Sequence, residues 1–206
     1  IINLKLLDIK IKKMLSYKES LKILKEANAL IEGHFILSSG LHSPQYVQCA
    51  QLMSKPSKAN IICKSLSEKI KNEFKIFDII LSPAMGGIVV GYELGKILNK
   101  ETIFCERING KFELRRDFKI KKNQKVLIIE DVITTGKSSL ECAELVLGNG
   151  ALVAGYACII DRSKNKSLLK EKIVSQVELD IPTYTKDNLP NNLLAIKAVK
   201  PGSRNL

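Results

Sequence analysis

Residues 126–139 of this 206-residue chain read VLIIEDVITTGKSS, and this stretch decides the fold class. The run starts with apolar, mostly β-branched residues that predict a strand buried on both faces, and it then reaches two adjacent carboxylates, Glu130 and Asp131. Two more β-branched residues lead to Thr134-Thr135-Gly136-Lys137-Ser138, which opens a predicted helix. A buried strand that runs directly into a helix is the repeating unit of a parallel α/β sheet.

The same stretch suggests a ligand. Consecutive N–H groups at a helix start, Thr and Ser hydroxyls, and a glycine that permits close approach form a cradle for a phosphate. Carboxylates repel phosphate but accept hydrogen bonds from neutral hydroxyls, so Glu130 and Asp131 suit a neighbouring diol. Ribose 5-phosphate has this layout. The alternative is an acidic strand end followed by an ordinary capped helix. The spacing G-x-x-x-x-G-K-[ST] of a nucleotide-binding P-loop is absent.

Working outward, apolar runs at residues 79–81, 102–105 and 152–160 predict further strands, and residues 57–73, 87–98 and 137–148 predict helices. We therefore expect an α/β fold with a central, mostly parallel sheet flanked by helices. Ligands bind beyond the carboxyl ends of such strands, so the chemistry is expected after Leu81, Cys105, Glu130 and Ile160. Nearer the N-terminus, residues 17–31 predict a helix that stops at Gly33, and residues 34–37 and 46–49 predict short extended pieces.

Composition predicts one folded domain over residues 17–206, with residues 1–16 as an extension for which disorder is one alternative. The longest uncharged stretch, residues 79–92, is too short to span a membrane. A formal charge of +12 favours an anionic partner, either a nucleic acid or a small phosphorylated ligand. Five scattered cysteines without a C-x-x-C pair indicate buried, reduced thiols in a cytoplasmic protein, and the two histidines cannot complete a zinc site.

Two more segments follow predicted strands. Residues 82–87, SPAMGG, bring paired glycines that let backbone amides approach an anion, although a tight turn that needs glycine for packing is the alternative. The candidate residues there are Ala84, Met85, Gly86 and Gly87. Residues 106–122 hold seven cations and the turn signal Asn109-Gly110. This segment is either a solvated basic hairpin or a mobile cationic loop, and its candidate residues are Arg107, Lys111, Arg115 and Arg116.

The string at 126–139 closely resembles the signature for phosphoribosyl pyrophosphate (PRPP) of the type I phosphoribosyltransferases. This resemblance implies that fold, with Glu130 and Asp131 on the ribose hydroxyls and residues 134–138 on the 5-phosphate. It also implies that residues 84–87 bind pyrophosphate, often through a strained peptide bond, and that Mg²⁺ binds through PRPP near the two acids rather than directly to the protein. The cationic loop would reach the neighbouring subunit's site, which implies a homodimer with shared active sites.

Further strings resemble the orotate-specific branch of this family. Residues 33–50, GHFILSSGLHSPQYVQCA, resemble the segment of an N-terminal hood (about residues 17–52) that faces the pyrimidine. Arg162 matches an arginine that faces the orotate carboxylate, a task that suits the planar guanidinium fork. Residues 200–204, KPGSR, resemble this branch's usual ending, so the resemblance covers residues 17–204. The implied orotate contacts are Ser39, Gly40, Tyr46, Thr134 and Arg162.

The resemblance implies transfer of ribose 5-phosphate from PRPP to orotate, giving orotidine 5′-monophosphate for pyrimidine synthesis, with Asp131 and the loop cations as catalytic residues. Two positions depart from the better-known branch, which has lysines where this chain has Ser38 and Gly86; loop arginines are expected to supply that charge. Two other functions stay open: a phosphoribosyltransferase for another base, and a PRPP-sensing regulator that binds nucleic acid. No recognised nucleic-acid-reading motif is present, so we expect neither a nucleic-acid nor a membrane partner.

Overall fold

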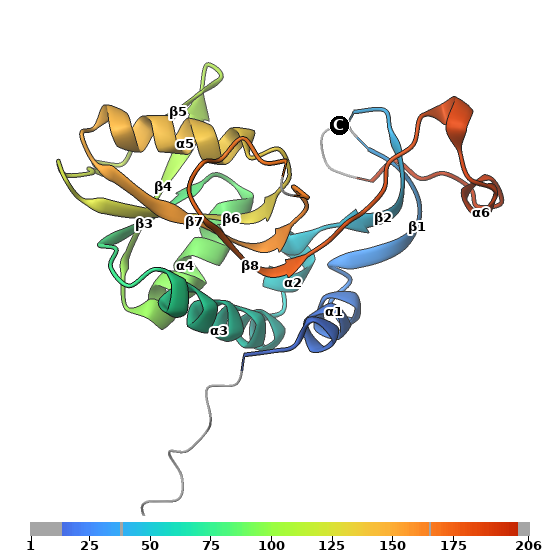
Figure 1. Ribbon diagram of the computed structural model, residues 1–206, viewed down its shortest axis with the longest axis horizontal. Coiled ribbons are helices and arrows are strands. Elements are labelled where there is room, and N and C mark those ends of the chain that lie inside the picture. The colour runs from blue at the N-terminus through green and yellow to red at the C-terminus, as the bar shows by residue number, and fades with distance from the viewer. Residues whose placement is uncertain (1–13, 38, 165, 202–206) are drawn as a thin grey trace, which may run out of the picture.

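A six-stranded sheet forms the centre of the molecule in the computed structural model, which describes residues 14–37, 39–164 and 166–201. The strand order is β5-β4-β3-β6-β7-β8; β4 and β5 are antiparallel and all other neighbours are parallel (Figure 1). The predicted mostly parallel sheet is thereby confirmed. The strands are β3 (Ile79–Pro83), β4 (Glu101–Ile108), β5 (Lys111–Leu114), β6 (Lys125–Ile133), β7 (Leu152–Asp161) and β8 (Ile173–Glu178).

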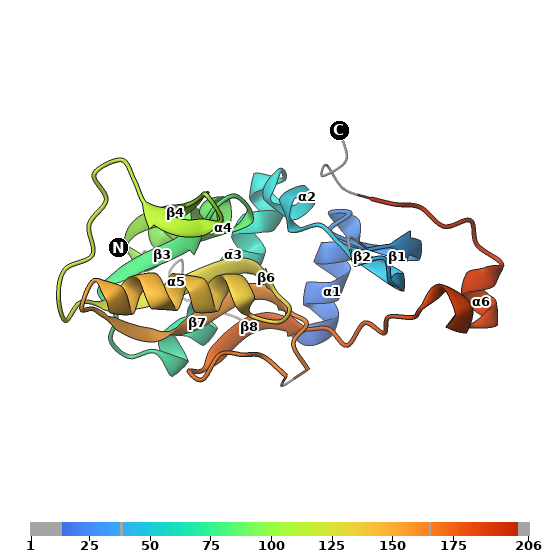
Figure 2. The same ribbon diagram turned by 90° about the horizontal axis from the view of Figure 1, so that it is seen from above.

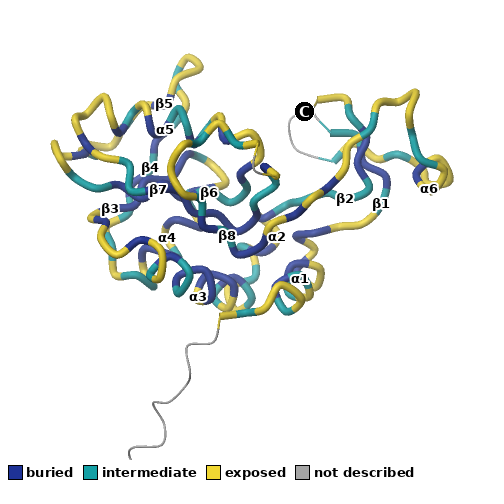
Figure 3. The backbone as a smooth tube through the Cα atoms, viewed as in Figure 1, coloured by how far each residue is buried: buried dark blue, intermediate teal, exposed yellow. Residues whose placement is uncertain are grey.

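Helices cover both faces of this sheet. Helices α3 (Pro56–Glu73) and α4 (Gly86–Leu98) lie on one face, and α5 (Lys137–Gly148) lies on the other (Figures 1 and 2). Successive β6 residues alternate between the two cores, since Leu127 packs with the α3 and α4 side and Ile128 packs with the α5 side. Burial on both faces explains why the strand sequences are continuously apolar, and the strands are the darkest part of Figure 3.

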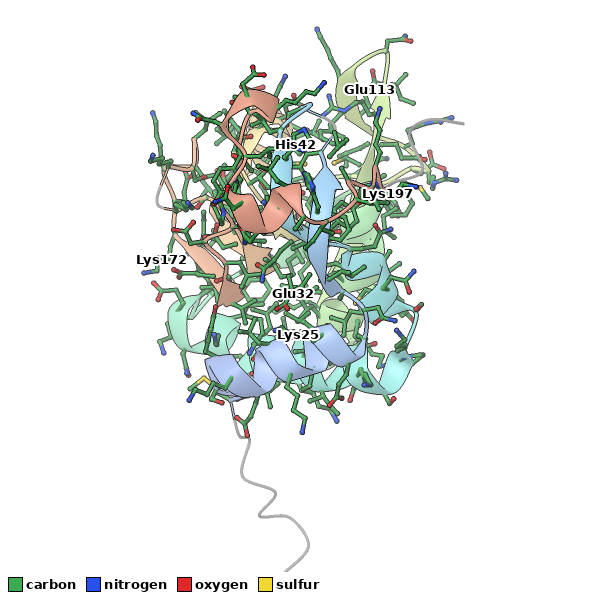
Figure 4. All side chains as sticks on the ribbon, turned by 90° about the vertical axis from the view of Figure 1, so that its right-hand side faces the viewer. Lys25, Glu32, His42, Glu113, Lys172 and Lys197 are labelled. Carbon is green, nitrogen blue, oxygen red and sulfur yellow. The ribbon has the colours of Figure 1, made fainter. Side chains whose placement is uncertain are left out.

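The hood lies beside the central sheet and contains α1 (Tyr17–Glu26), the antiparallel pair β1 (Leu30–Ile36) and β2 (His42–Val47), and α2 (Cys49–Met53). A capping box between Ser16 and Glu19 starts α1. An ion pair of 2.6 Å between Lys25 Nζ and Glu32 Oε1 joins α1 to β1 (Figure 4). After β8 the chain crosses to the hood through η1 (Lys186–Asn188) and α6 (Asn191–Leu194), so both ends of the sequence build this region (Figure 1).

The first helix is shorter than the sequence predicted. It ends at Glu26 instead of residue 31, because Asn28 adopts a left-handed φ of 58° and the chain then enters β1. Gly33, expected as the helix stop, lies inside that strand, and Cys49, expected in an extended piece, begins α2. The later predictions for helices at 57–73, 87–98 and 137–148 are confirmed to within one residue.

Some predicted features lie outside the described residues, namely the extension over residues 1–13, Ser38, and positions 202–204 of the C-terminal string. Within the described residues, all five cysteines are buried and unpaired in disulfides, as predicted. No described helix combines the length and apolar character needed to cross a membrane.

Helix α4 approaches the sheet through glycines, and this closeness should be testable. A methyl group on Gly95 would lie 1.9 Å from Thr102 Oγ1 and 3.1 Å from the Lys100 carbonyl oxygen, so Gly95→Ala should lower the free energy of unfolding by about 1–3 kcal/mol. Gly148→Ala is the matched control, because nothing lies within 4 Å of the added methyl group and alanine favours the helix. Chemical denaturation measures the free energy of unfolding of both variants. Equal values for Gly95→Ala and Gly148→Ala would contradict this close packing.

Candidate active site

Two half-buried carboxylates, Glu130 and Asp131 near the end of β6, form the centre of the candidate site. The Ser139 hydroxyl, from the first turn of α5, donates a hydrogen bond to Glu130 Oε1. The Asp131 carboxylate accepts a hydrogen bond of 3.0 Å from the Val132 backbone N–H. Cys49, the first residue of α2, contacts the Asp131 carbonyl oxygen at 3.7 Å, which joins the hood to this strand end.

Burial changes the acidity of both groups. Desolvation raises the pKa of Glu130 to about 7; the Ser139 hydrogen bond opposes this rise, and the Asp131 charge adds to it. Desolvation also raises the pKa of Asp131, against the hydrogen bond from the Val132 N–H. Neither acid has a basic side chain among the causes of its shift, so both would gain from the hydroxyl donors of a ligand.

The predicted phosphate cradle lies immediately after this strand. Gly136 has a left-handed φ of 78° and precedes the first residue of α5, which has no side-chain cap. The Lys137 N–H makes one long hydrogen bond, 3.4 Å to Thr135 Oγ1, and the following N–H groups of the first turn of α5 are available to an anion. Residues 167–169 support the loop from behind: the Leu168 N–H donates to the Thr135 carbonyl oxygen at 3.0 Å. Thr134, Thr135 and Lys137 are exposed, and Ser138 is half-buried.

The glycine-rich turn between β3 and α4 adjoins the carboxylates. The Ala84–Met85 peptide bond is cis, and the Ala84 N–H donates to the Cys105 carbonyl oxygen at 2.8 Å. A methyl group on Gly86 would lie 2.6 Å from Asp131 Oδ2, so any larger residue there would require Asp131 to move. This contact gives a physical reason for the glycine where the better-known branch has lysine. The structure thus brings residues 84–87 next to the acid pair.

The first part of the basic segment forms the hairpin of β4 and β5, which ends at Leu114, and residues 115–122 follow it outside the sheet. Asn109 and Gly110 both have positive φ, 47° and 85°, as expected for a tight turn between β4 and β5. Arg107 donates to Glu141 on α5, and its guanidinium lies 4.2 Å from the centre of the Phe112 ring. Arg116 donates to Glu106 at 3.0 Å. Lys111 and Arg115 are exposed.

The candidate orotate contacts come from two places. Ser39 and Gly40 lie exposed in the turn between β1 and β2, and Tyr46 is half-buried against Phe35, with 5.7 Å between ring centres. Arg162 follows β7, and its backbone N–H donates to the Ile133 carbonyl oxygen at 2.8 Å, which places it beside the start of the phosphate cradle. No hydrogen bond among the residues of known placement joins Arg162 to the hood turn.

Arg162 also carries an unmet hydrogen-bonding group. Its Nε is buried and has no partner, and desolvation lowers the pKa of the guanidinium. A buried donor without an acceptor is costly unless a ligand supplies one. An anionic group beside Thr134 would satisfy it.

Sequence reasoning missed several residues that hold these groups in place. Ser139 contacts Glu130, whereas Glu141 and Glu106 pair with the two arginines of the hairpin. Nothing in the sequence identifies these partners, because each pair joins different elements. Across the described ranges, no group of three or more His, Cys, Asp or Glu side chains could hold a metal ion by itself.

Comparison with known proteins agrees with this geometry. The phosphoribosyl transferase domain family matches residues 50–186. A protein of Parvibaculum lavamentivorans named orotate phosphoribosyltransferase is 46% identical over 189 residues, covering 90% of this chain and 97% of its own length. Its namesake from Maricaulis maris is 43% identical, covering 91% of this chain and 97% of its own length.

Solved structures agree as well. The crystal structure of orotate phosphoribosyltransferase from Aeropyrum pernix has a TM-score of 0.67 at 25% identity, covering 77% of this chain and 92% of that one. An adenine phosphoribosyltransferase from Thermoanaerobacter pseudethanolicus has a TM-score of 0.58 at 18% identity, covering 66% and 88%, which reflects the shared fold. With the acid pair, the cradle and these matches over most of its length, the chain belongs to the phosphoribosyltransferase family and, within it, to the orotate phosphoribosyltransferases.

Proposed function

We propose that this protein transfers ribose 5-phosphate from PRPP to orotate, giving orotidine 5′-monophosphate and pyrophosphate in de novo pyrimidine synthesis. One observation carries the proposal: Asp131 lies against Gly86 and one loop away from the uncapped start of α5. A diol site, a pyrophosphate site and a monophosphate site therefore adjoin at one edge of the sheet. PRPP carries these three groups around one ribose ring.

In the proposed mechanism, a ring nitrogen of orotate displaces pyrophosphate at C1 of the ribose. Positive charge develops on the sugar ring, and negative charge develops on the leaving group. Glu130 and Asp131 hold the ribose hydroxyls and, as carboxylates, stabilise the positive ring. Backbone N–H groups of residues 85–87 and 134–138 orient the two phosphate ends, whereas the Ala84 N–H is engaged with the Cys105 carbonyl oxygen. The protein thus acts by positioning and electrostatics, without a covalent nucleophile.

Mg²⁺ is the proposed cofactor, and the donors on this strand end fit it. Hard cations prefer carboxylate and phosphate oxygens, and Mg²⁺ usually keeps part of its water shell. Glu130 and Asp131 would hold the ion through the ribose hydroxyls or through water. When bound with PRPP, the ion would neutralise charge on the departing pyrophosphate.

Base selection is assigned to Arg162 together with the hood turn. The unpartnered Nε of Arg162 suits the orotate carboxylate, since a guanidinium can donate two parallel hydrogen bonds to it. Ser39, Gly40 and Tyr46 would contact the pyrimidine from the hood side.

A homodimer with shared sites is part of the proposal. Met85, Val89 and Tyr92, from the pyrophosphate turn and α4, expose 83%, 50% and 66% of their surface, which is unusual for apolar side chains beside a functional loop. A second copy of this chain packed there would bring the exposed cations Lys111 and Arg115 close to a neighbouring site. The five buried thiols fit the proposed cytoplasmic location.

Turnover of PRPP, Mg²⁺ and orotate, followed by orotate absorbance, tests the function directly, with adenine and hypoxanthine as competing bases. Asp131→Asn keeps the shape of the side chain but removes its charge, so turnover should fall by about 10²–10³. Arg107→Ala should cause a loss of similar order, with both variants folded by circular dichroism. Product from a purine alone, or salt-dependent RNA binding without orotidylate formation, would favour one of the other two functions.

The raised pKa of Glu130 should appear in stability. The folded protein keeps the Glu130 proton between about pH 4.5 and 7, where the unfolded chain has lost it. Folded protein therefore binds more protons in this window, and the ligand-free protein should lose roughly 3 kcal/mol of stability as pH rises through it. Glu130→Gln should remove this part of the pH dependence in denaturant titrations. If the free energy of unfolding changed with pH in the same way in both proteins, Glu130 would not be the source of this pH dependence.

The assignment of Arg162 predicts an effect confined to one substrate. Arg162→Ala should raise the KM for orotate by about 10- to 100-fold, because it removes a charged hydrogen-bond donor to the carboxylate. PRPP binding, measured by calorimetry, should stay within about twofold of the wild-type value, since Arg162 is not among the proposed PRPP contacts. An equal loss of affinity for both substrates would instead indicate that Arg162 supports the phosphate cradle.

A further inference from the structure

The only two histidines in the sequence, His34 and His42, meet inside the hood. They retain 5% and 7% of their exposed surface, and their ring centres are 4.8 Å apart. His34 Nε2 lies 2.6 Å from His42 Nδ1, and His34 Nδ1 lies 2.9 Å from the Ile196 carbonyl oxygen. The proposed chemistry uses neither ring, so this buried polar pair needs its own explanation.

The partners determine where the hydrogens lie. A carbonyl oxygen can only accept, so His34 Nδ1 must carry a hydrogen and donate it to Ile196. Only one of the two facing ring nitrogens can carry a hydrogen at a separation of 2.6 Å. With His34 neutral, that hydrogen belongs to His42 Nδ1, and the bond runs from His42 to His34. A directed chain therefore links β2 to β1 and β1 to the C-terminal segment, residues 184–199.

Backbone hydrogen bonds reinforce the same chain. The Val199 N–H donates to the His34 carbonyl oxygen at 2.9 Å, and the Ile36 N–H donates to the Val199 carbonyl oxygen at 2.8 Å. His42 and Tyr184 exchange a reciprocal pair of backbone bonds, 2.8 and 2.9 Å long. Figure 4 labels His42 on the hood and Lys197 on the C-terminal segment beside it. The two strands of the hood are thus held by a segment that follows them by more than 130 residues.

The row of hydrogen bonds through the two histidines ends at the hood turn. His42 pairs with Ile36 in the β1–β2 register, so the histidines lie at the base of the turn formed by residues 37–41. Above them, only two backbone bonds close the turn, Leu37 N–H to Leu41 O at 2.8 Å and Gly40 N–H to Leu37 O at 2.9 Å, among the described residues. The exposed turn carries Ser39 and Gly40, the proposed orotate contacts. Its position depends on the residues from which it rises, and these include His42.

We propose that His34 and His42 are positioning residues: held by the C-terminal segment, they fix the hood turn in the orientation that binds orotate. The inference rests on the proposed function, because the turn matters for catalysis only if it contacts the base. The pair touches neither substrate, and its effect reaches the reaction through Ser39 and Gly40. The C-terminal segment is therefore part of the base-binding half of the site.

The test compares His42→Leu with His42→Asn. Leucine removes the donor to His34 Nε2, so the KM for orotate should rise by about tenfold while kcat and the KM for PRPP change less than about twofold. Asparagine places an amide N–H near the former Nδ1 and should restore most of the orotate affinity. Unchanged orotate KM in the leucine variant, equal changes for both substrates, or no rescue by asparagine would each overturn the proposal.

A second pair of variants avoids the buried site. Val199→Pro removes the N–H that donates to His34, whereas Val199→Ala keeps it; the side chain itself is 53% exposed. Only the proline variant should raise the orotate KM. Amide hydrogen exchange of residues 37–41 provides a readout independent of activity, and it should speed up in His42→Leu and Val199→Pro. If exchange speeds up in these variants but the wild-type protein forms no orotidylate, only the proposed function is contradicted. If exchange in the variants is unchanged, the positioning role is contradicted.

Discussion

The desolvation of two half-buried carboxylates near one strand end is the constraint around which the candidate site is arranged. Glu130 and Asp131 are desolvated, and the neighbours that offset this cost are few: the Ser139 hydroxyl for one and a backbone N–H for the other. Such groups are costly in an empty protein and become favourable when a ligand brings hydroxyl donors. In the proposed complex, hydrogen bonds from the ribose hydroxyls would offset this desolvation cost and so favour binding of the sugar.

The acid pair also limits which residue can stand at position 86. Its backbone lies so near Asp131 that a methyl group would come within 2.6 Å of the carboxylate. The proposed pyrophosphate turn, residues 84–87, thus places backbone next to the acids and carries no cationic side chain. The cations come from another segment. They lie on the β4–β5 hairpin and just after it: Arg107 of β4 pairs with Glu141, and Arg116, which follows β5, pairs with Glu106. In the proposed dimer these pairs would have to exchange partners when pyrophosphate is present.

The two halves of the site differ in how they are built. In the proposed complex, PRPP contacts short runs of consecutive residues that follow β3 or that lie at and after the end of β6, and short-range geometry defines them. The proposed base contacts combine Arg162 with a hood turn whose strands are hydrogen-bonded to residues 184–199. This division suits a family in which one sugar donor serves many bases, because the base half can change while the strand ends stay as they are.

The sequence alone determined the sheet class and the order of acid pair, loop and helix, and it predicted which strand ends carry the chemistry, because apolar runs, turn residues and adjacent side chains are local properties. It did not determine where α1 ends, since that depends on Asn28 adopting a left-handed conformation before β1. Nor did it determine the partners Ser139, Glu141 and Glu106, or the meeting of His34 with His42 and Ile196. Only the tertiary structure decides such contacts, because they join residues of different elements. The separation of two residues along the chain does not determine their distance in space.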